Sequence, residues 1–171
     1  MLLEAIPRKI VSLVPSVTEN LIQFGRAPIG RTSFCIEPRE EVGSIPVVGG
    51  TKTPNIARIR SLSPDLVIAN REENRREDVL EIVSMGIPVW VTYPITIDET
   101  LSMMESLAEL CGGTPTARGL LSSIRVFLDG LPPASRFEPF RFLVPIWNDP
   151  WMAPAPRPIF TTFSRASAGR T

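Results

Sequence analysis

The chain has 171 residues, which fits one domain or a domain with an appendage but is short for two full-sized domains. Its 18 basic and 18 acidic side chains balance, so a nucleic-acid partner is not expected. It has no His and only two Cys, which argues against a protein-bound transition metal and removes the base of Ser-His-Asp and Cys-His catalysis. At 43% apolar residues, the composition is typical of a soluble globular protein.

The N-terminal segment lacks the pattern of a signal peptide, because Glu4 and Pro7 interrupt its apolar residues. As written, the chain is expected to be cytoplasmic. A start site further upstream would make a periplasmic or extracellular location possible. No apolar run approaches the roughly 18 residues of a membrane span. Cys35 and Cys111 can form one disulfide or remain two buried thiols, and the thiols are the favoured interpretation.

Short Val- and Ile-rich runs alternate with segments of helical period from residue 9 to about 112. This alternation predicts an α/β fold, an open parallel sheet with flanking helices. The predicted strands cover 9–15, 28–34, 45–50, 65–70 and 88–93. The strand at 65–70 is apolar on both faces and is therefore expected at the centre of the sheet.

Capping residues predict where the intervening helices begin and end. The expected first residues or caps are Ser16 with Glu19, Thr53 with Pro54, Asn74 with Glu77, and Asp98. The expected stops are Gly25, Gly86 and Gly112–Gly113.

The pattern changes at Thr114, where a helix of spacer length begins and runs to Gly130. A further apolar run at 140–147 predicts the first strand of a second, incomplete α/β lobe. The expected organisation is an N-terminal ligand-binding lobe, an inter-lobe helix, the start of a truncated second lobe, and a disordered tail. These parts are assigned to residues 8–113, 114–131, 132–153 and 154–171.

Ligands of open parallel sheets bind at the carboxyl ends of the strands. The residues that follow the predicted strands are polar, with Phe34 and Tyr93 as flat apolar faces and Arg71 as a cation for a carboxylate or amide. Such residues are also common in turns and caps. No persuasive catalytic constellation is present, so the protein is predicted not to be an enzyme.

A different class of function rests on the Gly49–Lys52 segment. A cytoplasmic doubly wound enzyme acting on a phosphorylated small molecule would use Gly49, Gly50 and Lys52 to hold the phosphate. The segment lacks the spacing of a P-loop, and no Gly-x-Gly-x-x-Gly motif occurs. A third interpretation is an inactive truncated fragment that associates with a second copy or another chain.

The order of five motifs resembles the N-terminal lobe of the iron-siderophore and cobalamin periplasmic-binding domain family. The motifs are Ile10-Val-Ser-Leu-Val-Pro-Ser-Val-Thr-Glu-Asn20, Gly30-Arg-Thr-Ser-Phe-Cys35, Val48-Gly-Gly-Thr-Lys-Thr-Pro-Asn55, Leu62-Ser-Pro-Asp-Leu-Val-Ile-Ala-Asn70 and Gly86-Ile-Pro-Val-Trp-Val91. The resemblance covers about residues 8 to 152. It implies two α/β lobes joined by one long helix, with a metal chelate held between them and delivered to an ABC importer. No cofactor and no protein-bound metal are implied.

The resemblance also assigns roles to single positions. Phe34 matches an aromatic residue that faces the chelate in cobalamin binders, whereas Thr51 and Asn70 stand where such binders often have Trp. A smaller or more polar chelate than cobalamin would fit as well. Ala57 stands where the family has the acidic residue that docks on the importer. Relatives continue for about another 100 residues, which favours a truncated or frame-shifted copy.

These observations predict a non-enzymatic substrate-binding protein of an ABC importer for cobalamin, haem or a ferric siderophore. From the second lobe, Trp147 or Trp151 is expected to line the cleft, with Trp147 preferred. The predicted ligand contacts are Ser16, Arg31, Phe34, Thr51, Asn70, Arg71, Tyr93 and Trp147.

Overall fold

The computed structural model describes residues 6–132 and 143–152. Its contacts divide the chain into two compact units. The first contains the described residues up to Tyr93 together with Met104–Leu120, and the second contains Pro94–Met103 and the described residues from Leu121 onward. The predicted domain limits remain predictions, and the predicted tail at 154–171 lies outside the described residues.

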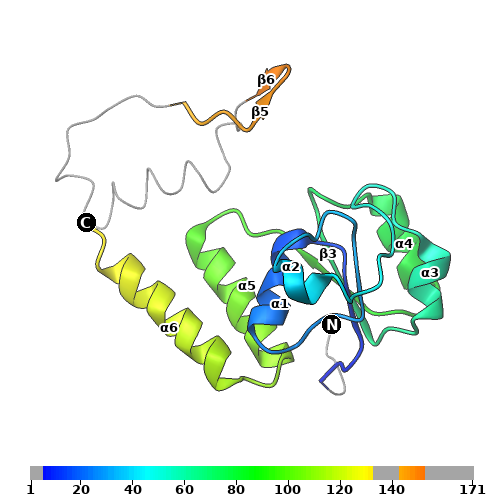
Figure 1. Cartoon of the computed structure of the whole chain (residues 1–171), viewed down its shortest axis with the longest axis horizontal. Helices are drawn as coiled ribbons and strands as arrows, with labels where there is room; N and C mark the ends of the chain where they lie inside the picture. The colour runs from blue at the N-terminus through cyan, green and yellow to red at the C-terminus, as the bar shows by residue number, and fades with distance from the viewer. Residues whose placement is uncertain (1–5, 133–142, 153–171) are drawn as a thin grey trace. The chain divides into compact units, whose positions relative to one another are not determined.

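The first unit is built on a four-stranded parallel sheet (Figure 1). Its strands are β1 (Ile10–Ser12), β2 (Gly30–Arg31), β3 (Leu66–Asn70) and β4 (Val89–Thr92), in the order β2-β1-β3-β4. The register places Val67 opposite both Val11 and Val89. The predicted α/β class and the internal position of the 65–70 strand are therefore confirmed.

Helices cover both faces of this sheet, because alternate residues of its apolar strands point to opposite sides. Figure 1 shows α3 (Ile56–Ser61) and α4 (Arg76–Ser84) on one side and α1 (Pro15–Gln23) on the other. One hydrophobic core cluster packs residues of the sheet and of the segments beside it against α3 and α4. Its fully buried members are Val11, Leu13, Val48, Ile59, Val67, Ala69 and Ile82.

Two strand predictions need correction. Residues 45–50 do not form a strand, since Val47 makes only an isolated bridge with Arg31 and Gly49 another with Pro54. The segment instead turns back on itself. The 88–93 strand was expected to be buried, but β4 is an edge strand and Val91 is 45% exposed. An edge strand has a neighbour on one side only, so part of its surface stays open.

The predicted start of α1 is wrong by one residue. Pro15 occupies the first helical turn, the N-cap is Val14, and no side chain caps the helix. Proline is favoured at this position because its missing N–H has no partner to lose there. Glu19 does not complete a capping box and instead accepts a hydrogen bond from the Gln23 side chain. The end of the helix at Gly25 agrees with the prediction.

Two further caps differ from those predicted, by two positions for α3 and by one for α4. Asn55, not Thr53, caps α3, because its side chain accepts the Arg58 N–H at 2.9 Å. The N-cap of α4 is Arg75, and no side chain caps that helix. Asn74, predicted as this cap, has other partners, described below.

The long helices α5 (Ile97–Leu110) and α6 (Pro115–Asp129) each contribute to both units. Thr96 and Glu99, rather than Asp98, form the capping box of α5: the Glu99 N–H donates to Thr96 Oγ1, and Glu99 Oε2 accepts from the Thr96 N–H. The end of α5 before Gly112–Gly113 and the helix at residues 115–129 agree with the predictions from the sequence.

The second unit also contains a short hairpin of β5 (Trp147–Asn148) and β6 (Trp151–Met152). The predicted strand at 140–147 is not found in its described part, because residues 143–146 carry no strand and only Trp147 belongs to β5. Residues 140–142 lie outside the described residues. A short α2 (Arg39–Val42) in the first unit completes the elements.

The thiol prediction is confirmed, since Cys35 and Cys111 are both free and buried. Within the described part of the chain, no helix is long and apolar enough to cross a lipid bilayer.

Candidate ligand-binding edge

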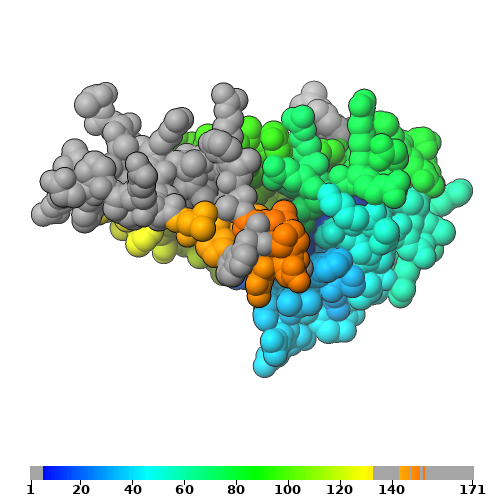
Figure 2. Space-filling view, turned by 90° about the horizontal axis from the view of Figure 1, so that it is seen from above, coloured from blue at the N-terminus to red at the C-terminus, as the bar shows by residue number. Residues whose placement is uncertain are grey.

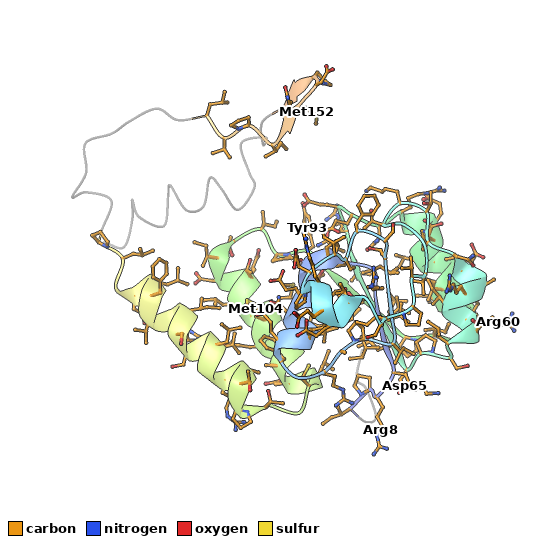
Figure 3. The ribbon with its side chains drawn as sticks, in the orientation of Figure 1. Arg8, Arg60, Asp65, Tyr93, Met104 and Met152 are labelled. Carbon is orange, nitrogen blue, oxygen red and sulfur yellow. The ribbon has the colours of Figure 1, made fainter. Side chains whose placement is uncertain are left out.

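The four parallel strands end on one side of the sheet, which we call the carboxyl edge. It consists of residues at the strand ends and directly after them, 13–14, 31–35, 70–75 and 92–93, together with the turn at 49–53. Figure 3 shows Tyr93 at this end of the sheet, with Asp65 and Arg8 at the opposite end. In Figure 2 the light-blue to cyan surface, which includes the loop after β2 and the 49–53 turn, adjoins the green surface of the β3–α4 region.

The side chain of Arg31 stabilises the loop after β2 through hydrogen bonds. Its guanidinium donates to the carbonyl of Val42 at 2.8 Å and to those of Thr32 and Cys35 at 3.2 and 3.0 Å. The half-buried Arg31 side chain therefore fixes the path of residues 32–42. The same loop leaves Phe34 61% exposed.

The 49–53 turn depends on glycine. Gly49 has φ of +106°, and a Cβ there would lie 2.6 Å from the Thr53 carbonyl oxygen. The turn closes through a bond from the Gly50 N–H to the Thr53 carbonyl, and Gly49 accepts the Ser33 N–H at 2.8 Å. A Cβ at Gly50 would touch the Phe34 ring at 3.6 Å, so this ring lies beside the turn.

The loop after β3 is organised by two asparagines. Asn70 Oδ1 accepts the backbone N–H groups of Glu72 and Glu73. Asn70 Nδ2 lies within hydrogen-bond distance of the Thr92 carbonyl and hydroxyl oxygens. Asn74 Oδ1 accepts the Asn70 N–H at 2.7 Å. The β3 loop is thus tied to the end of β4.

Arg71 and Tyr93 form a stacked pair at the ends of β3 and β4. The guanidinium carbon of Arg71 lies 4.6 Å from the centre of the Tyr93 ring. Such a contact is worth about 0.5–1 kcal/mol at an exposed site. The backbone supports it, because the Arg71 N–H donates to the Thr92 carbonyl at 3.0 Å. Both side chains are exposed, so a planar, charged surface faces solvent.

Lys52 connects the turn to the β3 loop by donating to the Glu72 carbonyl. Glu73 lies in the same region and is half-buried. Burial raises the pKa of the Glu73 carboxyl, the Lys52 ammonium lowers it, and the Glu72 charge adds to the increase. The edge therefore carries charges of both signs, and Arg71 and Lys52 are both exposed.

Most predicted ligand contacts lie on this edge. Five of them lie at the ends of the strands or in the loops that follow: Arg31, Phe34, Asn70, Arg71 and Tyr93. Thr51 joins them in the turn, and Ser16 is exposed in the first turn of α1, directly after β1. Trp147 is in the second unit, and its side chain lies outside the described residues. The role of each residue in ligand contact stays a prediction.

Contacts with the protein already occupy two of the predicted side chains. Arg31 donates to three carbonyls, and Asn70 uses both ends of its amide. Sequence reasoning missed Asn74 and Thr92, which are 6% and 4% exposed. Thr92 is the last residue of β4 and Asn74 lies four positions after β3, so their places near the strand ends were visible in the sequence, but their burial was not.

The chemistry of this edge is that of recognition. Among the described residues, no group of three or more acidic or sulfur side chains is placed to hold a metal ion. The exposed aromatic rings and the stacked guanidinium provide flat surfaces and hydrogen-bond donors instead.

Comparison with known proteins shows similarity over part of the chain. No protein-family profile matches the chain. The vitamin B12-binding protein of Salmonella typhimurium is 34% identical over 106 residues, which are 62% of this chain and 39% of that protein. Over this segment the chain is therefore similar to a protein whose name describes vitamin B12 binding. The match thus spans about two fifths of the length of that relative.

Solved structures of haem- and siderophore-binding proteins have a similar fold. The periplasmic haem-binding protein RhuT of Roseiflexus sp. RS-1, in its apo form, gives a TM-score of 0.73 at 22% identity, covering 96% of this chain and 65% of RhuT. The siderophore-binding protein BauB, bound to two acinetobactin molecules and ferric iron, gives a TM-score of 0.76 at 17% identity, covering 97% and 61%. At these identities the likeness concerns the fold.

Proposed function

We propose that this protein binds a metal chelate, such as cobalamin, haem or a ferric siderophore, at the carboxyl edge and without catalysis. The observation that carries the proposal is the convergence of five loops, bonded to one another, that present Phe34, Arg71 and Tyr93 to solvent. The names of the relatives support it, since they are binding proteins for B12, haem and a siderophore.

The side chains favour a chelate with a flat organic face and polar groups at its periphery. Phe34 and the Tyr93–Arg71 pair offer stacking surfaces, and the Arg71 guanidinium can meet a carboxylate or an amide of the ligand. Thr51 and Asn70 offer no aromatic surface where cobalamin binders often have Trp. A chelate smaller or more polar than cobalamin is therefore compatible with this edge.

An ABC importer is the proposed partner, and the periplasm or the cell exterior is the proposed site of action. The α3 surface that would face the importer by resemblance carries an exposed Ala57, followed by the exposed Arg58 and Arg60. Docking there would rely on groups other than a carboxylate at position 57. No cofactor besides the bound chelate is proposed.

A titration tests the proposal. Cyanocobalamin, haemin and a set of ferric siderophores are added while Trp fluorescence is followed, with free tryptophan as the control for light absorption by the ligand. Saturable binding of at least one chelate is expected. No saturable change with any of them contradicts the proposal.

A matched pair of variants locates the site. Phe34→Ala should weaken chelate binding by about 1–3 kcal/mol, because a stacking surface is lost. Leu80→Ala is the control, since Leu80 is also exposed, at 55%, but belongs to the outer surface of α4. Equal affinities of the two variants would remove Phe34 from the site.

The phosphate-binding enzyme is the less favoured function. The Gly50 N–H, which would have to meet a phosphate, already donates to the Thr53 carbonyl, and Lys52 donates to the Glu72 carbonyl. Protection of the fold against heat by phosphate or a nucleotide would revive this alternative.

A further inference from the structure

Asn74 is the polar side chain that joins the loops of the carboxyl edge. Its Nδ2 donates to the carbonyls of Leu13 and Thr51, at 3.3 and 3.0 Å, and its Oδ1 accepts the Asn70 N–H at 2.7 Å. Leu13 is 61 positions away in the sequence and Thr51 is 23 positions away. One amide therefore connects the ends of β1 and β3 and the 49–53 turn.

The helix that follows does not use this side chain. The N-cap of α4 is Arg75, and the helix start has no capping hydrogen bond from a side chain. An asparagine at a helix start most often stabilises that start. Here the three hydrogen bonds of the amide go to the edge loops instead, and the residue is only 6% exposed.

The connection continues to β4 through Asn70 and Thr92. Asn70 Nδ2 lies 3.2 Å from the Thr92 carbonyl oxygen, and the Thr92 hydroxyl donates to the Ala69 carbonyl at 3.1 Å. A buried network with satisfied hydrogen bonds restricts its members to one arrangement. The loops that carry Phe34, Arg71 and Tyr93 all border this network, because Ser33 donates to Gly49 and Arg71 donates to Thr92.

We propose that Asn74 is a positioning residue of the ligand site, which fixes the 49–53 turn and the loops after β1 and β3 relative to one another. The residue is too buried to be a main ligand contact, and it acts through the loops that it joins. The part of this inference that concerns affinity rests on the proposed chelate binding. The part that concerns loop order does not.

Two variants and one control test the inference. Asn74→Ala removes all three bonds, whereas Asn74→Asp keeps an acceptor for the Asn70 N–H and loses both donors. Asp65→Ala is the control, because Asp65 also joins separate segments, by accepting the Arg8 and Lys9 N–H groups, but does so at the opposite end of the sheet.

Amide hydrogen exchange measures the loop order without any ligand. In both Asn74 variants the amides of Ser33 and Gly50 should exchange at least about tenfold faster relative to the sheet amide of Val67. In Asp65→Ala the exchange rates of the Ser33 and Gly50 amides, divided by the rate of the Val67 amide, should not change. A loss of global stability alone would accelerate all three amides together. That result in the Asn74→Asp variant would overturn the inference.

Titration of the same variants with cyanocobalamin, haemin and ferric siderophores gives the second readout. The Kd of whichever chelate the wild type binds should rise about tenfold or more in the Asn74 variants and stay unchanged in Asp65→Ala. Equal affinities in all variants would overturn the positioning role. If the wild type binds none of these chelates, the proposed function fails, and the exchange ratios alone decide the loop-positioning role.

Discussion

Amide and hydroxyl side chains hold the carboxyl end of the sheet together, whereas a carboxylate holds the amino end. At the carboxyl end, Asn70, Asn74 and Thr92 join four segments while buried or half-buried. At the amino end, the exposed Asp65 accepts two backbone N–H groups at 2.9 Å each. The same task, joining distant segments, is thus done by different groups.

The difference follows from what each group can do. A neutral amide both donates and accepts, so it can bridge a carbonyl and an N–H, and its burial does not require the desolvation of a charge. An ionised carboxylate only accepts and is costly to bury, so it serves where solvent reaches it. The network of Asn70, Asn74 and Thr92 at the carboxyl end is therefore neutral, whereas the contribution of Asp65 at the amino end depends on pH.

The largest expected contrast concerns glycines at the two ends. Gly49→Ala should lower the free energy of unfolding by about 3 kcal/mol or more, because a Cβ would clash with the Thr53 backbone in a left-handed conformation. Gly86→Ala, near the amino end, should cost only about 1 kcal/mol, since Gly86 has φ of +79° with nothing within 4 Å. Urea denaturation followed by circular dichroism measures both. An equal decrease in the free energy of unfolding for both variants would show that the 49–53 turn can move to accommodate the Cβ.

Removal of one hydroxyl from the buried network should have a smaller effect. Thr92→Val keeps the shape but loses the bond to the Ala69 carbonyl and an acceptor for Asn70. We expect a loss of about 1–2 kcal/mol in the free energy of unfolding. Thr116→Val, at an exposed position of α6, is the control and should stay within about 0.5 kcal/mol. A neutral Thr92 variant would mean that the hydroxyl contributes nothing to the edge.

Glu73 is the acidic group of the carboxyl edge whose pKa is shifted by burial. Burial raises its folded pKa, so the folded state holds its proton more tightly than the unfolded state does, and the charged form lowers stability above the folded pKa. Glu73→Gln should therefore raise the free energy of unfolding at pH 7, by less than about 1 kcal/mol. This gain should disappear as the pH falls through the folded pKa. A gain that persists in acid would have another cause.

Asp65 should respond to acid in the opposite direction. The Arg8 and Lys9 N–H groups lower its pKa, so its contribution is present above the unfolded value and is lost as the pH falls through the folded one. As the pH falls from 5 through the folded pKa of Asp65, the free energy of unfolding of the wild type should decrease more than that of Asp65→Asn. Urea midpoints at several pH values measure this difference. Parallel curves for the two proteins would contradict the role of the carboxylate.

Strand interiors and helix ends were predictable because their signals are local. The apolar run at 65–70 indicated an internal strand, since a strand with neighbours on both sides and helices on both faces must be apolar on both faces. Gly25, Gly86 and Gly112 marked helix ends because each adopts a positive φ there. The 45–50 run failed, since Val and Ile alone do not show that a segment folds back at Gly49 instead of pairing along its length.

Capping residues were the weakest predictions, because one side chain has many possible partners. Asn74 stands where a cap is expected, yet it bonds to Leu13 and Thr51. Arg31 and Asn70 were predicted as ligand contacts, and the structure shows their protein bonds. A polar residue after a strand can face a ligand or support the loop that does, and its sequence neighbours are the same in both cases.

From its sequence alone, this protein's α/β class, its strand order in the chain and its family resemblance could be established, because apolar periodicity and motif order are properties of the linear chain. Only the tertiary structure decided which polar side chains hold the carboxyl edge and which remain open to solvent. The physical reason is that burial and hydrogen-bond partners arise when segments 23 and 61 residues apart meet, and no local pattern records that meeting.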